Sequence, residues 1–215
     1  MGERRVRIRL VEWSSYPPLS AADPEARFWE EVEEWWVTES VEGRFMVCGT
    51  EAMTDAASFA KHAQEQPTDL FAIEEELCSD VCTWYPIGHF VCFKNGAPGT
   101  FPEDIAAALA QTSYIGYLLV GRAHRGHGVA AKSLDAFKKV ASERYAHPSV
   151  SLCVFAENSR ALSISRGLAS ASSPLSATNP SLPAYLLPSS LYQQMVLSYG
   201  TSGAPNMRGK FLIFK

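Results

Sequence analysis

The hydrophobic and polar positions of this chain repeat at two spacings, which predict two kinds of element. Apolar residues at positions 6, 8 and 10 alternate with arginines at 5, 7 and 9, which predicts a strand at or near a sheet edge. Residues 112–120 are almost continuously apolar, as in a central strand covered on both faces. Spacings of three and four residues predict helices around residues 28–36, 50–66 and 130–145.

The remaining patterns are shorter. Further strands are predicted at residues 71–74, 86–93, 149–155 and 210–214, while residues 192–199 fit either a strand or a helix. The first two of these strands form a hairpin with an unusually long connection, residues 75–84. Residues 169–190 contain four prolines and many serines, and are predicted to form a long surface loop. The alternation of strands and helices predicts an α/β protein.

Length and composition narrow the class of protein. The chain has 215 residues, 47% of them hydrophobic and 20% charged, which suits one folded domain over residues 1–215. A formal net charge of −4 argues against a nucleic-acid partner, because nucleic-acid-binding domains usually carry a basic excess. The first ten residues contain no continuous apolar run, so we expect a cytoplasmic protein that does not contact membranes. A monomer and a homodimer fit the sequence equally.

The five cysteines raise the question of a metal site. Cys78, Cys82, His89 and Cys92 are ligand types that zinc prefers. However, residues three apart in a strand point to opposite faces, so His89 and Cys92 are not expected to reach one ion. We therefore predict reduced cysteines and no metal.

A run of acidic residues accompanies the first helix. Residues 25–42 contain seven glutamates and one arginine. One interpretation is the solvated face of an amphipathic helix, and the other is a rim that attracts a cationic substrate.

The segment after the central strand has the features of an anion site. Glycines at 126 and 128 lie where a tight turn opens the helix at 130–145, and a helix N-terminus carries partial positive charge. Arg122 and Arg125 are placed to pair with a phosphate, and His124 and His127 to neighbour it. The spacing matches neither the ATP-binding nor the dinucleotide-binding glycine motif, so ATP and NAD are poor candidate ligands.

Two motifs resemble the GNAT superfamily of N-acyltransferases. The sequence Arg125, Gly126, His127, Gly128, Val129, Ala130 fits that family's Q/R-x-x-G-x-G/A pyrophosphate motif, and Asn158 begins a segment similar to its N-x-x-A/S signature. The second signature departs from the family after Leu168, where Ala169 and Ser170 replace the usual Gly-Phe. The resemblance implies a mixed, mostly antiparallel sheet of about six to seven strands. It also implies helices on both faces and a splayed fourth and fifth strand.

The resemblance further implies a function. Acetyl-CoA or another acyl-CoA would be the co-substrate, bound by the motif and Asn158, with its pantetheine arm against the main chain of Leu118, Leu119 and Val120. A short acyl group would pass directly to an amine of a small molecule or peptide. Two alternatives remain open: a non-catalytic acyl-CoA-binding module, and an acyltransferase that takes its acyl group from an acyl carrier protein.

The candidate catalytic residues depart from the family's pattern. Where several relatives hold a carboxylate base on the fourth strand, this chain has Tyr114, and where many hold a tyrosine acid it has Ser165. By strand alternation, Tyr114 would point into the cleft and Tyr117 away from it. His89, on the preceding strand, has the more suitable ordinary pKa for a base. No cysteine or serine has an evident base beside it, which favours direct transfer over an acyl-enzyme.

Overall fold

The computed structural model describes residues 4–18, 20–38, 55–77, 83–94, 107, 109–110, 112–155, 158, 161, 194–199 and 207–214. The chain forms two compact units, one of Met1–Asn95 with Ile115–Phe137 and one of Gly96–Tyr114 with Lys138–Lys215. The strand β4 (Thr112–Val120) and the helix α4 (Val129–Tyr145) each pass from one unit to the other. That residues 1–215 form a single domain stays a prediction.

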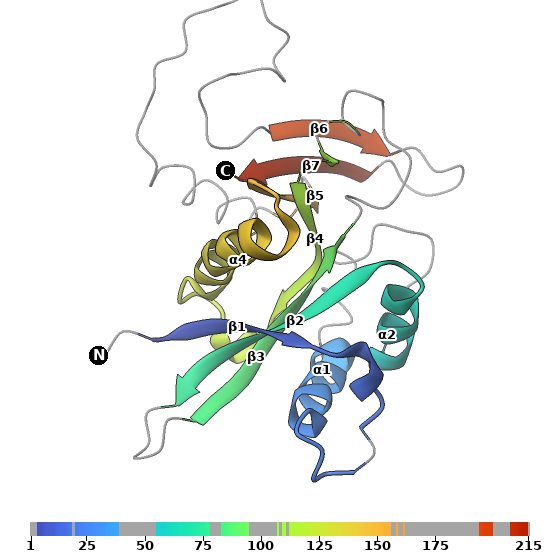
Figure 1. Cartoon of the computed structure of the whole chain (residues 1–215), viewed down its shortest axis with the longest axis vertical. Helices are drawn as coiled ribbons and strands as arrows, with labels where there is room; N and C mark the ends of the chain where they lie inside the picture. The colour runs from blue at the N-terminus through green and yellow to red at the C-terminus, as the bar shows by residue number, and fades with distance from the viewer. Residues whose placement is uncertain are drawn as a thin grey trace, which may run out of the picture. The chain divides into compact units, whose positions relative to one another are not determined.

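The first unit is built on four strands in chain order (Figure 1). They are β1 (Val6–Val11), β2 (Thr68–Leu77), β3 (Thr83–Phe93) and most of β4. The pairs β1–β2 and β2–β3 are antiparallel. The pair β3–β4 is antiparallel as well, because the amide of Gly121 donates to Ile87 O at 2.8 Å while Gly116 lies against the ring of Phe93. As predicted, β1 is an edge strand.

The second unit continues from the beginning of β4. Its strand order is β4, β5 (Ser149–Phe155), β7 (Met207–Phe214) and β6 (Gln194–Tyr199), with β7 antiparallel to both neighbours. The beginnings of β4 and β5 lie together, with Thr112 Oγ1 2.5 Å from Ser151 Oγ, so these two strands run parallel. The predicted fold class is confirmed. Residues 194–199 form a strand, which decides between the two interpretations of that segment.

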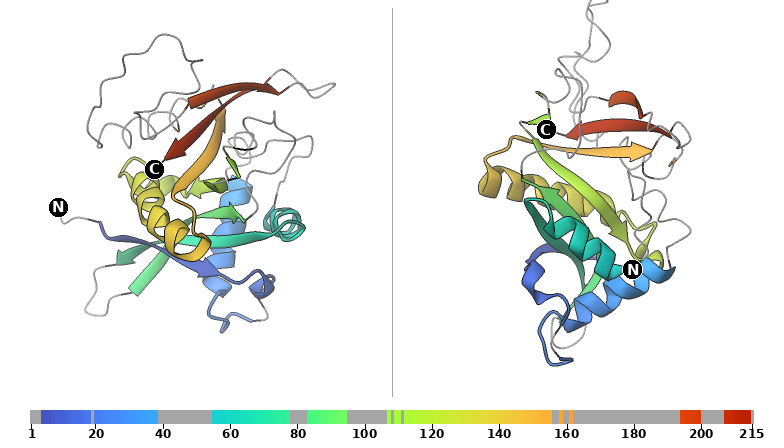
Figure 2. Two further views of the ribbon diagram at one scale, coloured as in Figure 1. Left: turned by 45° about the horizontal axis from the view of Figure 1, so that its top comes forward. Right: turned by 90° about the vertical axis from the view of Figure 1, so that its right-hand side faces the viewer.

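Helices cover both faces of the first unit's strands (Figure 2). The rings of Phe71 and Phe90, paired across β2 and β3, pack on Phe137 of α4 with centroids 5.2 and 5.0 Å away. The preceding residue of β3, His89, points to the other face, against the rings of α1 (Ala26–Thr38) and α2 (Ala56–Gln64). This alternation places α4 on one face and the two N-terminal helices on the other.

The predicted apolar stripe of α1 is confirmed as core: it consists of Phe28, Trp29, Val32, Trp35 and Trp36, all buried. The described part of α2 begins after Asp55, whose carboxylate accepts a hydrogen bond from the amide of Ser58 at 2.7 Å. The stripe of α2 then runs through Ala56, Phe59, Ala60 and Ala63. The predicted start at residue 50 lies outside the described residues.

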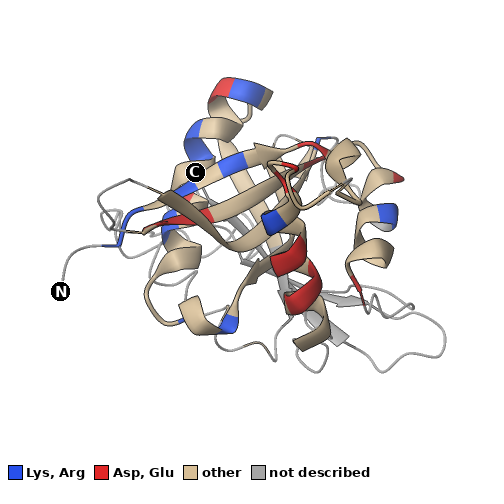
Figure 3. Ribbon diagram, turned by 90° about the horizontal axis from the view of Figure 1, so that it is seen from below, with Lys and Arg blue, Asp and Glu red and all other residues tan. Residues whose placement is uncertain are grey.

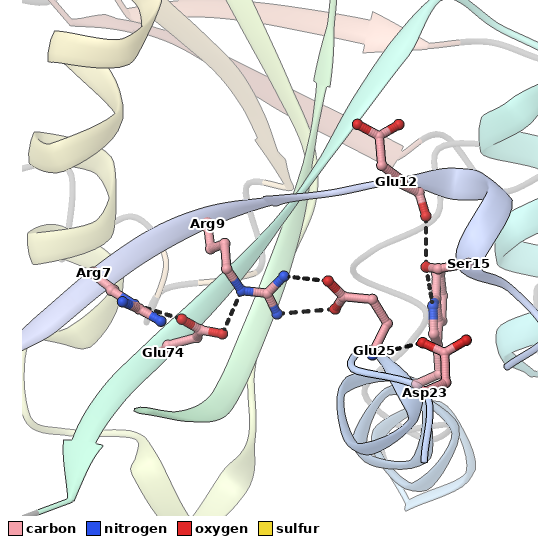
Figure 4. A network of polar contacts seen from close by, with 8 residues as sticks. Arg7, Arg9, Glu12, Ser15, Asp23, Glu25 and Glu74 are labelled. Carbon is pink, nitrogen blue, oxygen red and sulfur yellow. Dashed lines mark hydrogen bonds and ion pairs between the residues drawn. The ribbon is translucent and has the colours of Figure 1, made fainter. Parts of the chain in front are cut away.

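Both hairpin strands are longer than predicted, because β2 extends to Leu77 and β3 begins at Thr83. The glutamates at 75 and 76, assigned above to a connection, are strand residues like Glu74. Arginines of β1 pair with them: Arg7 and Arg9 contact Glu74 at 2.6 and 2.7 Å (Figure 4). The register shifts between Ile73 and Glu74, opposite Pro86, which lacks an amide hydrogen for the ladder.

Candidate functional site

The glycine turn between β4 and α4 has the backbone of an anion site. After a short 3-10 helix at Arg122–His124, Gly126 and Gly128 adopt φ values of 86° and 72°. Side chains other than glycine are strained in this left-handed region. A Cβ at either position would have no atom within 4 Å. The conformation therefore requires glycine, and the space outside the turn is open to a ligand.

The start of α4 adds favourable electrostatics. The amide of Lys132 donates to Gly128 O at 3.0 Å and closes the first helical turn, so the amides that precede it point out of the helix end. No acidic residue lies in this first turn. The end of α4 thus presents main-chain donors and partial positive charge, the arrangement that binds phosphate.

Arg125 also supports the turn itself. Its Nε donates to the carbonyl oxygen of Val120, the last residue of β4, at 2.7 Å. This part of the guanidinium holds the turn against the end of its own strand. The predicted pairing of Arg125 with a phosphate stays a prediction, and the contact with Val120 adds a role in supporting the turn.

The two histidines of the turn also differ. His127 is exposed, which fits a residue beside a ligand. His124 instead turns toward the sheet, where its Nδ1 lies 3.2 Å from Glu75 Oε2 of β2. This contact directs Nδ1 to Glu75, and the predicted place of His124 beside a phosphate stays a prediction.

The main-chain groups at the end of β4 point alternately toward β3 and away from it. The amide of Gly121 bonds to Ile87 O, and a Cβ at Gly88 would lie 2.4 Å from Leu119 O. Leu119 and Gly121 therefore face β3, and the main-chain groups of Leu118 and Val120 face away from it. Of the three residues predicted to contact a pantetheine arm, Leu118 and Val120 have the suitable orientation.

The alternation of β4 breaks at Tyr117, which has a φ of 52°. Its ring packs against Phe59 of α2 and Phe93 of β3, with centroids 5.7 and 6.1 Å away. Tyr117 therefore faces the side of α1 and α2, whereas simple alternation predicted that it would point away from a cleft. Tyr114 is buried, and with the alternation broken the spacing no longer determines its direction. Its catalytic role stays a prediction.

His89 is a poor candidate for a general base. Its side chain is 0% exposed, and neither ring nitrogen has a hydrogen-bond partner among the described residues. The rings of Trp35, Trp36 and Phe59 surround it at centroid distances of 4.9 to 6.2 Å. Burial lowers the pKa of His89 to about 3, so it is neutral at physiological pH and not poised to exchange a proton there. The structure assigns His89 to the core.

Some of the remaining predicted site residues lie within the described part of the chain, and others lie outside it. Asn158 Oδ1 accepts a hydrogen bond from the amide of Ala161 at 3.0 Å, the geometry of a helix cap. Ser165 lies outside the described residues, as do Cys78 and Cys82 of the rejected zinc set. The described part of the chain contains no group of three or more His, Cys, Asp or Glu side chains that could hold a metal ion.

One cluster beside the turn was not predicted. The Tyr85 hydroxyl of β3 donates to Glu31 of α1, and the Arg27 guanidinium lies 4.1 Å from the centre of the Tyr85 ring. Burial, followed by the negative charge of Glu34, raises the pKa of Glu31. The helical spacing of Glu31 could not separate it from the exposed glutamates on α1. Tyr85 lay between the predicted connection at 75–84 and the predicted strand at 86–93.

The acidic residues of α1 are otherwise on its outer side. Glu30, Glu33 and Glu34 are exposed, and Figure 3 shows the red bands that they form with Glu31 along the helix.

Among the described residues, no helix is both long and apolar enough to cross a membrane.

Comparison with known proteins agrees with this geometry. Residues 10–164 match the family described as the acetyltransferase (GNAT) family. No curated protein is significantly similar in sequence. RimL, described as a ribosomal L7/L12 alpha-N-protein acetyltransferase in complex with coenzyme A, has a TM-score of 0.57 and 10% identity, over 97% of this chain and 92% of that one.

Two other solved structures are similar to the same extent. An acetyltransferase (GNAT family) from Bacillus anthracis has a TM-score of 0.56 and 13% identity, over 98% of this chain and 94% of that one. The yncA protein from Salmonella typhimurium, described with its cofactor acetyl-CoA, has a TM-score of 0.52 and 12% identity, with the same coverage. At these identities the likeness concerns the fold.

Proposed function

Since this chain belongs to the GNAT acetyltransferase family, we propose that it is an N-acyltransferase that uses acetyl-CoA or another short acyl-CoA. The observation that carries the proposal is the turn at Gly126 and Gly128. Both glycines are in the left-handed conformation, the outside of the turn is open, and α4 begins directly behind it. The coenzymes named for RimL and yncA support the same class of ligand.

The cofactor would be held mostly by main chain. The amides from Arg125 to Ala130 would bind the diphosphate. The main-chain groups of Leu118 and the amide of Val120, whose carbonyl oxygen already accepts from Arg125, would bind the pantetheine arm. Main-chain recognition tolerates changes of side chain, so a similar binding site is compatible with low sequence identity.

The acceptor is proposed to be an amine. The exposed glutamates Glu30, Glu33 and Glu34 on α1 give that surface a negative potential, which favours the approach of a cation. In the reaction, the neutral amine nitrogen attacks the thioester carbonyl carbon. The C–N bond forms, the C–S bond breaks, and the amine proton is lost to a base while the thiolate takes up a proton.

We do not propose His89 as the proton acceptor, because burial lowers its pKa to about 3, which makes it a weak base, and its side chain is 0% exposed. Tyr114 acting through water, or water alone, remains the proposed route, with Ser165 as a candidate proton donor to the thiolate. Direct transfer needs mainly positioning of the thioester and amine, together with polarisation of the carbonyl. The protein is expected to act in the cytoplasm, as a monomer or homodimer.

Calorimetric titration with acetyl-CoA tests the binding part. The wild type should bind, and Gly128→Leu should lose affinity at least about tenfold, because a side chain there is strained and would project into the ligand space. Gly128→Asn is the matched control for strain, since asparagine tolerates the left-handed region better than leucine does. A folded Gly128→Leu protein with wild-type affinity would overturn the proposal.

Turnover is tested separately with a panel of amines, by following the release of the CoA thiol. Release that depends on an amine supports the enzyme, whereas binding without turnover on any amine supports a non-catalytic acyl-CoA-binding module. Turnover only with an acylated carrier protein would identify the donor as that carrier. Radiolabelled acyl-CoA incubated without amine should leave no label on the denatured protein; label that later passes to an amine would contradict direct transfer.

A further inference from the structure

The glycine turn is joined to the sheet by a side-chain contact far from it in sequence. His124, at the end of the 3-10 helix before the glycines, places Nδ1 3.2 Å from Glu75 Oε2 near the end of β2. The His124 side chain is 25% exposed and that of Glu75 is 9% exposed. A contact so little exposed to water is stronger than an ion pair on the open surface.

Glu75 is itself held in place by the edge strand. Arg4 contacts the Glu75 carboxylate at 3.2 Å, and Val6 of β1 pairs with Glu75 in the antiparallel ladder. Lys132, in the first turns of α4, donates from Nζ to the carbonyl oxygen of Arg4 at 2.9 Å. The segments before and after the glycines therefore both reach the paired ends of β1 and β2.

The His124 ring is also confined from the side. The Tyr85 ring lies beside it with centroids 6.4 Å apart, and the Tyr85 hydroxyl is fixed by its hydrogen bond to Glu31. His124 thus lies against β2 and β3, with its Nδ1 directed to Glu75.

We propose that His124 is a positioning residue for the cofactor, which holds the glycine turn on Glu75 so that its main-chain amides converge on the diphosphate of acyl-CoA. The inference rests on the proposed function. Two glycines give the turn a large conformational freedom, and fixing it in advance lowers the entropy that must be lost on binding. The contact acts on the binding of acyl-CoA and not on the transfer step.

The experiment measures the affinity for CoA by calorimetry in the full chain. His124→Ala removes the contact, whereas His124→Asn keeps a side-chain N–H donor at the same number of bonds from the backbone. Glu75→Gln weakens the contact from the other side. Glu76→Gln is the matched control, because Glu76 pairs with Arg5 at 2.9 Å on the same two strands and has no contact with the turn among those described.

Two comparisons separate an effect of the His124–Glu75 contact from an effect on the sheet. His124→Ala and Glu75→Gln should each weaken CoA binding about 3- to 10-fold, the usual range for one such hydrogen bond. Because both substitutions remove the same contact, the double variant should lose no more affinity than the single variant with the larger loss. His124→Asn should recover most of the affinity, and Glu76→Gln should bind as the wild type does. In turnover, KM for acyl-CoA should rise while kcat and KM for the amine stay constant.

The two proposals fail in different ways. If the wild type does not bind CoA, the proposed function is wrong. If the wild type binds and His124→Ala binds equally well, or if Glu76→Gln loses as much as Glu75→Gln, the role of His124 is refuted. Additive losses in the double variant would refute it too. Far-UV circular dichroism and thermal unfolding of each variant show whether a loss arises from the turn or from the fold.

Discussion

Trp35 of α1 lies directly against Gly121, the residue that joins β4 to the glycine turn. A Cβ at position 121 would lie 2.8 Å from Trp35 Nε1 and 3.3 Å from Trp35 Cε2. Both residues are buried, and the Gly121 amide is bonded to Ile87 O. The start of the turn is therefore enclosed between a core tryptophan and β3, and its position depends on the absence of a side chain.

The first prediction follows from this contact. Gly121→Ala should lower the free energy of unfolding by about 1–3 kcal/mol, because a methyl group would overpack a site from which a buried indole cannot move away. Urea unfolding measures the loss. In a Trp35→Phe background the same substitution should cost less, since phenylalanine lacks the indole nitrogen. An equal cost in both backgrounds would show that the contact is not the cause.

The second prediction concerns Arg125. Arg125→Met should weaken CoA binding about tenfold, because Val120 O loses its donor and the turn loses a charge, whereas Arg125→Gln keeps an N–H donor and should lose less. Calorimetry on the two variants separates the effect of losing the hydrogen bond to Val120 from the effect of losing the positive charge. Equal losses in both variants would assign the effect to charge alone.

The third prediction is a pH dependence of stability. The pKa of His89 is about 3 in the folded chain, against an ordinary value of 6.5, so between these values the unfolded chain binds a proton that the folded chain excludes. The resulting contribution to stability is complete above pH 6.5 and is lost as the pH falls. The loss is up to about 1.4 kcal/mol per pH unit.

His89→Phe should lack this loss while keeping a ring among Trp35, Trp36 and Phe59. Urea unfolding at pH 7.5 and pH 5 should show that the wild type loses about 2 kcal/mol more than the variant between the two conditions. If both proteins respond to pH in the same way, His89 is protonated or solvated in the folded chain.

The fourth prediction concerns the charge network at the edge of the sheet (Figure 4). Glu74 is buried and accepts from Arg7 and Arg9, and Arg9 also contacts Glu25 just before α1 at 2.5 and 3.0 Å. Glu74→Gln should cost about 1–3 kcal/mol of unfolding free energy, because two partly buried guanidinium groups lose their shared carboxylate.

The control for Glu74 is an exposed ion pair of the same chemistry. Lys139 and Glu143 lie 3.9 Å apart on α4 and are both largely exposed, so Glu143→Gln should change stability by about 0.5 kcal/mol or less. Urea is the suitable denaturant because it does not screen charge. Similar effects of the two substitutions would mean that burial does not strengthen the Glu74 network.

The elements and the glycine turn could be predicted because they depend on local spacing. The strand at 112–120 has the predicted bounds, and the apolar stripe of α1 is buried as its helical spacing indicates. The left-handed glycines at 126 and 128 likewise follow from their place between a strand and a helix. In each case the residues that determine the conformation lie within a few positions of one another.

Contacts between distant residues decided the rest. The glutamates at 75 and 76 extend the strand beyond its predicted end, where arginines about seventy residues earlier pair with them. His89 is a core residue because helices on one face enclose it, and His124 turns inward because Glu75 meets it from β2. The sequence by itself determined the order of the elements and the turn. The burial, charge environment and direction of each polar side chain depend on neighbours that only the tertiary structure brings together.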